Sequence, residues 1–237
     1  MRTVIGRRRF FCGCGAIIGA ASLSGGACGA GGPDVVPVEF ATFHYQPFAN
    51  DYVRFMNVTI PAGRVAAYHR HTTDFAQVYM AVSPAEGTPL GGKPLVVPRK
   101  VGEVLFSNYS KQPLVHQVAN VGDSDFQVMG FEILDSQPGR FTPLARSVPY
   151  VPVMDNDRVR GWRLILQPGE SAAAMQQAAP GMRIVVQGGE LIEGVQDKPD
   201  HTLNLKHGDF AWQNVSPSRT LRNAGSSPVE LVEFELK

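Results

Sequence analysis

The sequence contains an internal repeat, and this repeat limits the fold more than any other feature. Asn-Asp at 50–51 recurs at 156–157, and a turn glycine follows at the same distance in both copies, at Gly63 and Gly169. Both pairs are separated by 106 residues, so the intervening segments have equal length. This period is too long for the stacked units of a solenoid protein. We therefore expect two copies of one domain of about 90 to 100 residues.

Short apolar or alternating runs recur along the chain, and Gly, Pro, Asn and Asp bound them. Such runs are typical strands of an all-β sandwich or barrel, and long helical periodicity is absent. The runs lie at 53–60, 77–82, 103–106, 126–133, 163–166, 183–186 and 229–236. We expect a first domain at 33–142 and a second at 143–237, joined through the proline-rich stretch 136–152.

Residues 1–32 are predicted to be an export leader. Arg2 and the arginines at 7–9 precede an apolar, small-residue stretch at 10–21, with no acidic residue before position 33. The stretch is too short and too rich in glycine for a membrane span of about 20 residues. Arg-Arg-Arg-Phe-Phe at 7–11 resembles a twin-arginine export signal, with a general secretory leader as the alternative. We therefore expect a periplasmic or secreted protein.

All three cysteines, Cys12, Cys14 and Cys28, lie in this leader. Cleavage beyond Cys28 would leave a chain without disulfides or thiolate ligands. Gly-Ala-Cys at 26–28 also resembles the end of a lipobox, so a lipid anchor at Cys28 is an alternative. Without the four leader arginines, 18 basic residues face 21 acidic ones, which gives no support for nucleic-acid binding. Edge strands make a homodimer a plausible assembly.

Two histidines, His69 and His71, follow a Pro-Ala-Gly turn. In a strand they would project from one face, with their Cα atoms about 6 to 7 Å apart. Neutral imidazoles in this arrangement suit a first-row transition metal ion. A lone His-x-His pattern is a weak signal, but the second half contains the same segment as Met-Gln-Gln at 175–177.

The pattern Gly-x5-His-x-His from Gly63, followed by a Gly…His-x3-Asn pattern from Gly102, is similar to the two motifs of the cupin family. With the duplication, the chain resembles a bicupin over essentially all of residues 50–237. This resemblance implies two tandem jelly-roll barrels. It also implies one divalent metal ion in the first barrel, held by His69, His71 and His116. Iron is the first expectation, with Zn, Mn, Ni and Cu as alternatives.

The first motif departs from the family, which usually has a Glu soon after the histidines. Ala76 occupies that position, and Asp74, two residues earlier, would share its strand face. The site is therefore either three-His or three-His plus Asp74, with positions open for water, oxygen or substrate. Three extra residues within 107–113 are expected to form a loop near the metal. His44, His201 and His207 match no motif position, and we expect ordinary surface or turn residues there.

The second half replaces the three motif histidines by Met175, Gln177 and Arg219. A guanidinium stays charged and would repel a cation, so we expect the second barrel to be metal-free. Arg219 has two interpretations. It either binds a carboxylate ligand through its bidentate fork or pairs with a neighbouring acid.

The resemblance implies a metal-dependent enzyme acting on a small molecule, with a three-His centre most like that of an iron-dependent dioxygenase. A hydrolase or an isomerase is an alternative reaction class. No general base can be assigned, since Asp74 is the only acidic residue next to the motif. A different class of function is a non-catalytic protein that binds a small molecule or a metal.

Overall fold

The computed structural model describes residues 32–135 and 137–237, so the predicted leader with its cysteines lies outside the described residues except for Gly32. Residues 33–237 form one unit by their contacts. Apart from one 3-10 helix at Val38–Phe40, the regular elements of this unit are strands. No helix in the described part of the chain is long and apolar enough to span a membrane.

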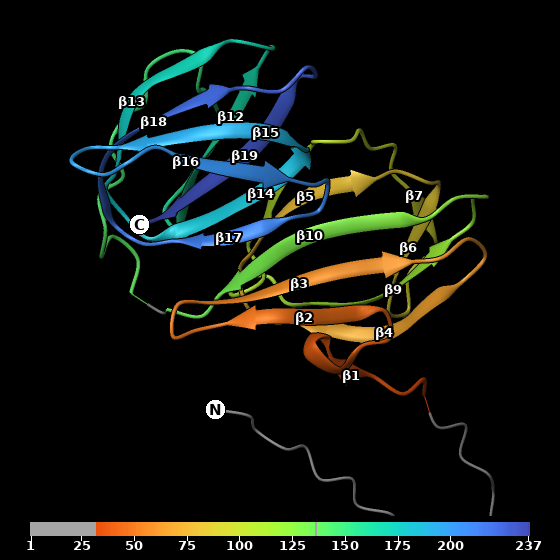
Figure 1. Cartoon of the computed structure of the whole chain (residues 1–237). Helices are drawn as coiled ribbons and strands as arrows, with labels where there is room; N and C mark the ends of the chain where they lie inside the picture. Colours follow the sequence, from red (N-terminus) through yellow and green to blue (C-terminus); the bar gives the residue numbers. More distant parts are fainter. Residues whose placement is uncertain (1–31, 136) are drawn as a thin grey trace, which may run out of the picture. The chain divides into compact units, whose positions relative to one another are not determined.

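The first half forms two five-stranded sheets (Figure 1). The sheet in the order β1-β4-β9-β6-β7 contains Val36–Pro37, Val65–His71, Leu114–Asn120, Ala85–Pro89 and Leu95–Val96. The sheet in the order β2-β3-β10-β5-β8 contains His44–Ala49, Val53–Ile60, Phe126–Ile133, Phe75–Ala81 and Val104–Ser107.

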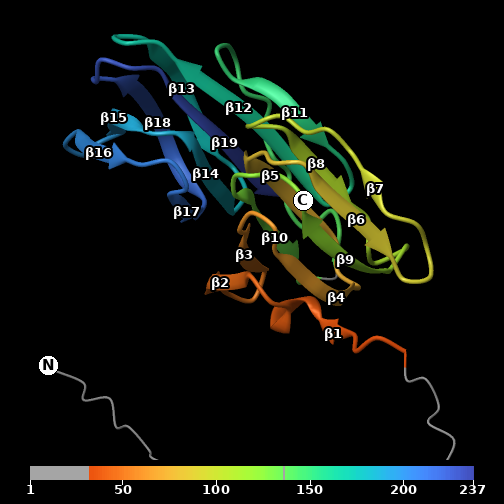
Figure 2. The same cartoon turned by 90° about the vertical axis from the view of Figure 1, so that its right-hand side faces the viewer.

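The second half repeats this arrangement with one strand fewer. A five-stranded sheet in the order β11-β12-β19-β14-β17 contains Val151–Asp155, Val159–Leu166, Val229–Leu236, Gly181–Gln187 and Phe210–Gln213. A four-stranded sheet in the order β13-β18-β15-β16 contains Ser171–Gln177, Ser216–Asn223, Gly189–Val195 and His201–Leu205. In Figure 1 the orange-to-green strands of the first half and the teal-to-blue strands of the second form two groups, and in Figure 2 β11 of the second half lies beside β8 of the first. The predicted all-β fold of two tandem jelly-roll barrels is confirmed.

Asn120, four residues after His116, and Asn223, four residues after Arg219, have the same structural role in the two halves. The Asn120 side-chain amide donates to the carbonyls of Ile60 and Ser124, both at 2.8 Å. The equivalent Asn223 amide donates to Leu166 at 2.9 Å and to Ser227 at 2.8 Å. A buried amide without such partners would be costly, so these residues fix the turn that follows each strand. The sequence repeat therefore reflects a repeat of turn hydrogen bonds.

The two halves share an apolar core. Its side chains come from β3, β5 and β10 of the first half and from β12, β14 and β19 of the second. Phe131 meets Phe234 edge to face, with ring centroids 5.3 Å apart, and both side chains are fully buried. Phe55 stacks on Phe210 at 4.2 Å. Burial of one such aromatic side chain is worth about 1.5 to 3 kcal/mol. The second half therefore supports the sheet that forms one wall of the first barrel.

Candidate metal centre

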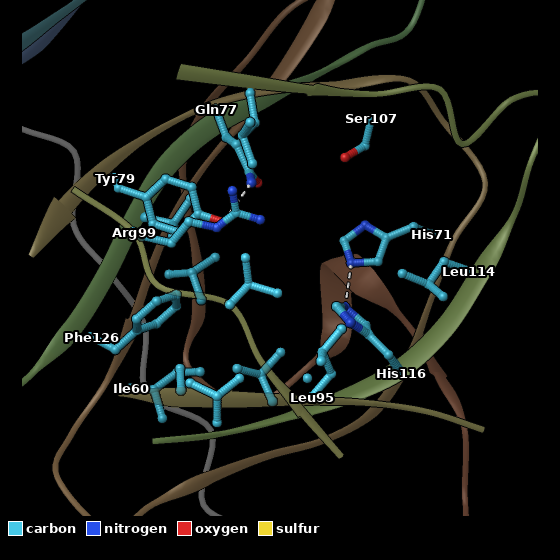
Figure 3. Close-up of a pocket in the computed structure, with 18 of the residues that line it drawn as sticks. Ile60, His71, Gln77, Tyr79, Leu95, Arg99, Ser107, Leu114, His116 and Phe126 are labelled. Atoms are coloured by element: carbon cyan, nitrogen blue, oxygen red, sulfur yellow. Dashed lines mark hydrogen bonds between the residues drawn. The ribbon is translucent and has the colours of Figure 1, made fainter. Parts of the chain in front are cut away.

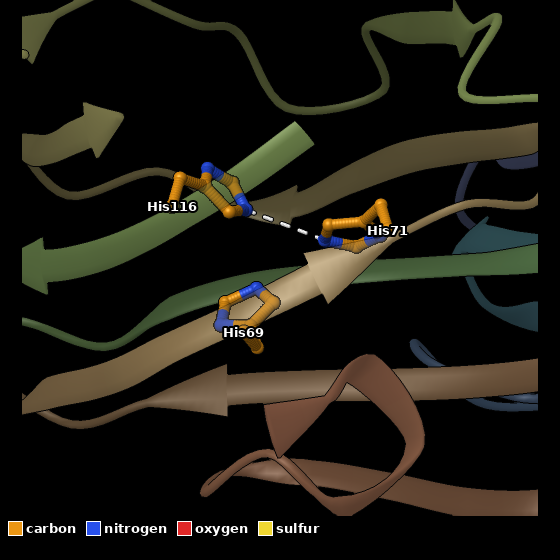
Figure 4. Close-up of side chains that lie close together, drawn as sticks. All are labelled: His69, His71 and His116. Atoms are coloured by element: carbon orange, nitrogen blue, oxygen red, sulfur yellow. Dashed lines mark hydrogen bonds between the residues drawn. The ribbon is translucent and has the colours of Figure 1, made fainter. Parts of the chain in front are cut away.

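Three histidines meet inside the first barrel on the neighbouring strands β4 and β9. His69 lies opposite His116 in the antiparallel ladder, and His71 lies two residues farther along β4 (Figure 4). One ligand nitrogen from each ring lies within 4.8 Å of the other two. The alternation of β4 buries both of its histidines, while Arg70 between them is exposed. The sequence pattern and the strand geometry therefore bring the three predicted ligands together.

These imidazoles fit a metal ion. The Nε2 atoms of His116 and His71 are 3.3 Å apart, a separation that suits two nitrogens sharing one ion through bonds of about 2.1 Å. The Nδ1 atom of His69 lies 2.8 Å from the Ala67 carbonyl, as expected when Nδ1 donates and Nε2 is left for a metal. Burial, together with the neighbouring imidazoles, lowers the pKa of His71 to about 2 and that of His116 to about 3. The rings are thus neutral at pH 7, which is the form that binds metals.

A fourth histidine lies beside this group. His44 comes from β2 in the opposite sheet, and its ring centroid is 4.6 Å from that of His69. Its Nδ1 atom lies 2.9 Å from the Thr42 carbonyl, and burial lowers its pKa to about 4. The expectation of an ordinary surface or turn residue is wrong for His44, whereas His201 and His207 are exposed in the second half. No motif marks His44, so only the pairing of β2 with β3 could have revealed it.

Asp74 lies apart from the three histidines. Its Oδ1 atom accepts a hydrogen bond from the Ser110 backbone at 2.9 Å, and its Oδ2 faces Arg158 of the second half at 3.4 Å. The physical reason is the alternation of β5, because Asp74 has the parity of Ala76 and Val78, and those side chains point away from the histidines into the core shared with the second half. Asp74 therefore holds the 107–113 loop and the second half rather than completing the site.

The alternation of β5 also corrects the expected position of the missing Glu. Phe75, Gln77 and Tyr79 line the cavity beside the histidines. Ala76 and Val78 point the other way, into the core shared with the second half. Gln77 is therefore the residue at the cavity-facing position, one residue after Ala76. Its amide nitrogen donates to the Tyr79 hydroxyl at 3.3 Å.

The histidines face a cavity of about 730 Å³ inside the first barrel. Most of its lining is apolar, and none of the described residues that line it is an Asp or a Glu. Tyr109, from the longer loop, stacks on His71 with ring centroids 4.6 Å apart. Tyr79 and Arg99 lie across the cavity from His71 and His116 (Figure 3). The cavity therefore has an imidazole end, an apolar middle and a second polar end.

The equivalent place in the second barrel holds ion pairs. Arg219 lies opposite Met175 in the ladder, just as His116 lies opposite His69. The Arg219 guanidinium donates to Glu193 at 2.8 Å and to Glu233 at 2.9 Å. These contacts match the interpretation that Arg219 pairs with neighbouring acids, and they leave the predicted carboxylate-ligand role without support.

Arg146, from the link between the halves, extends this ionic cluster. Its side chain is 1% exposed and pairs with Glu233 at 2.5 Å and with Glu235 at 2.7 Å. The guanidinium also lies 4.1 Å from the ring centroid of Trp162. The buried ion-pair network consists of Arg146, Arg183, Arg219, Glu193, Glu233 and Glu235. In the second barrel, these three positive and three negative side chains occupy the position that corresponds to the three histidines of the first barrel.

No family model and no curated protein matches this chain. Solved structures do match. The cupin 2 conserved barrel domain protein from Leptotrichia buccalis has a TM-score of 0.51 at 10% identity, over 82% of this chain and 88% of that one. A variant of salicylate 1,2-dioxygenase from Pseudoaminobacter salicylatoxidans, in complex with gentisate, has a TM-score of 0.54 at 12% identity, over 78% and 69%. Oxalate decarboxylase from Lactobacillus farciminis has a TM-score of 0.54 at 11% identity, over 81% and 80%. The chain therefore has the cupin fold, present twice.

Proposed function

We propose that this two-barrel cupin protein is a metal-dependent enzyme of the dioxygenase type, acting on a small and mostly apolar molecule. One observation carries the proposal. Three neutral imidazoles, from His69, His71 and His116, converge at one end of an apolar cavity of about 730 Å³. A volume of this size is typical of sites for small-molecule ligands.

The ligand set favours a catalytic metal over a structural one. Three protein ligands leave coordination positions open, whereas structural sites are usually closed by four. A bound ion would supply Lewis-acid and redox chemistry, and no carboxylate ligand would reduce its positive charge. Imidazole suits iron, copper, nickel and zinc, and iron is our first choice for a dioxygenase. The apolar walls and the Tyr109 ring over His71 would exclude water from the metal end.

The structural likeness to salicylate 1,2-dioxygenase supports this reaction class among the chemistries that cupin folds support. Function resides in the site rather than in the fold, so the support from likeness is secondary to the three-His geometry. The leader-like segment 1–32 further supports a place in the cell envelope. Fractionation of expressing cells tests this part, because a chain retained in the cytoplasm with its first residues intact would contradict it.

A non-catalytic binding protein is the second candidate function. The observation that favours it is the absence of any Asp or Glu among the described residues that line the cavity. An enzyme needing a carboxylate as general base would find none there. The same lining suits a carrier that holds an apolar ligand next to a metal ion.

Metal content and oxygen consumption distinguish these outcomes. We expect one metal ion per native chain, and loss of the metal in a His116→Ala variant. A His207→Ala variant, which removes an exposed histidine of the second half, should retain it. Equal metal content in all three proteins would refute the metal site. Oxygen uptake by the loaded protein with a catechol, thiol or diketone supports the enzyme. A loaded protein that binds these compounds but consumes no oxygen is a binding protein.

A further inference from the structure

We propose that the cavity end opposite the histidines binds a carboxylate, so that the ligand is a small apolar molecule with an anionic group far from the metal. This inference deepens the proposed function, since it names the substrate class of the same site. It depends on the proposed function in one respect: the end of the ligand far from the carboxylate lies at the metal.

The charges of the cavity lining support an anionic ligand. None of the described lining residues is acidic, and two lining residues, Lys93 and Arg99, are basic. Both come from the segment between β6 and β8. Lys93 is exposed and lies near Pro89, which is opposite His116 in the ladder, so Arg99 is the lining residue that provides positive charge at the end away from the neutral histidines. In an apolar environment this charge is weakly screened and favours a negative group.

Arg99 is held in place from outside the cavity. Its Nη1 donates to Glu103 at 2.8 Å, and its guanidinium lies 5.2 Å from the ring centroid of Tyr79. Glu103 does not line the cavity. The ion pair therefore anchors one edge of the guanidinium, and the remaining N–H groups of the fork are left to bind a ligand. An arginine fixed in this way loses little side-chain entropy when it binds a carboxylate.

Tyr79 adds a second donor at the same end. Its hydroxyl oxygen accepts from the Gln77 amide at 3.3 Å, so its own proton is available to a ligand. Burial raises the pKa of Tyr79, which keeps this hydroxyl protonated at neutral pH. Arg99 and Tyr79 lie side by side at the end of the cavity opposite His71 and His116 (Figure 3). Two donors and no acidic group match a carboxylate, which only accepts hydrogen bonds.

The walls between the two ends define the rest of the ligand. Ile60, Leu105 and Phe126 line the cavity, and none of them offers a hydrogen bond. A polar linker between the two ends of a ligand would lose its hydration without compensation. An aromatic ring or a short alkyl chain fits this middle section.

The competing interpretation is that Arg99 and Glu103 form a structural pair that only stabilises the segment before β8. Both side chains are about one quarter exposed, and such pairs contribute little to stability. The two interpretations differ in ligand preference. A structural pair would not make the protein discriminate between a carboxylate and a neutral ligand of similar shape.

Calorimetric titration of the metal-loaded protein with two probes tests the proposal. The probes are 3,4-dihydroxyphenylacetate and 4-ethylcatechol, which share the catechol and differ in the distal carboxylate. We expect the carboxylate probe to bind about tenfold more tightly or better, as expected for a hydrogen bond to a charged group. Arg99→Gln should remove this preference, because it should weaken binding of the carboxylate probe far more than binding of 4-ethylcatechol. Lys100→Gln, the same charge change at an exposed neighbour outside the lining, should retain it.

Two further variants keep the test decisive. Arg99→Lys retains the charge without the fork and should preserve only part of the preference, and Tyr79→Phe should reduce it with the ring in place. Equal affinity of the native protein for the two probes, failure of both to bind, or a preference that survives Arg99→Gln would overturn the proposal. Oxygen uptake is measured separately. A carboxylate preference without oxygen uptake would leave this inference standing and contradict only the enzymatic function.

Discussion

Replacing Arg146 by alanine is expected to lower the free energy of unfolding by about 3 to 5 kcal/mol. The side chains of Arg146, Glu233 and Glu235 are each at most 1% exposed. The substitution would leave Glu235 with the Ala179 amide at 3.2 Å as its remaining hydrogen-bond partner. Removal of one partner from a buried ion pair is costly because the other charge stays out of water. The contact with Trp162 at 4.1 Å would also be lost.

Urea unfolding followed by tryptophan fluorescence and by far-ultraviolet circular dichroism measures this difference. Arg140→Ala is the matched control, since Arg140 belongs to the same link and pairs with Asp135 at 2.8 Å, but is 48% exposed. An exposed pair of this kind is worth about 0 to 1 kcal/mol. The reasoning would be refuted if the two variants lost the same small amount of stability. Metal binding by the first half should persist in Arg146→Ala under native conditions, which separates the ion-pair network from the metal site.

The histidine group leads to two more predictions. His44→Ala should weaken metal binding by about tenfold, because residues that support metal ligands typically contribute tenfold to a hundredfold, and competition with a chromogenic chelator measures it. An unchanged affinity would show that the ring beside His69 does not support the site. The second prediction concerns pH. The pKa values of His44, His71 and His116 lie near 4, 2 and 3, below the usual 6.5, so below pH 6.5 the unfolded chain binds more protons than the folded one. The metal-free protein should lose up to about 1.4 kcal/mol per pH unit for each such histidine as the pH falls from 6.5 towards 4. Urea titrations at several pH values should show a shallower slope for His116→Gln, and an identical slope would contradict the assignment.

The fold could be predicted from the sequence because its strongest signals are local. Asn120 and Asn223 each bond to two carbonyls of the turns around them, so each copy must keep the residue at the same place. His69 and His71 share a face of β4 by strand alternation alone. Such features depend on residues a few positions apart or on a repeat that is visible in the chain.

The errors at the site arise where the answer depends on which face of a strand points inward or on a distant segment. Strand β5 turns Gln77 into the cavity and Ala76 away from it, and Asp74, with the parity of Ala76, lies outside the histidine group. His44 on β2 and His69 on β4 belong to different sheets, and they meet only because these sheets face each other in the first barrel. Arg146 bonds to Glu233, 87 residues farther along the chain, and no local pattern connects them.

A single strand, β5, separates the cavity of the first barrel from the core shared with the second half. On one side Gln77 and Tyr79 touch the ligand space, and on the other Val78 contacts the core that contains Met182 of the second half. The second barrel has ion pairs in place of the three histidines, yet its apolar side chains pack against β5 and support this strand. Substitutions at positions such as Met182, far in sequence from every histidine of the metal group, could thus change which molecules the first barrel accepts. The cavity of the first barrel is therefore shaped by residues of both halves of the chain, although the three histidines come from one.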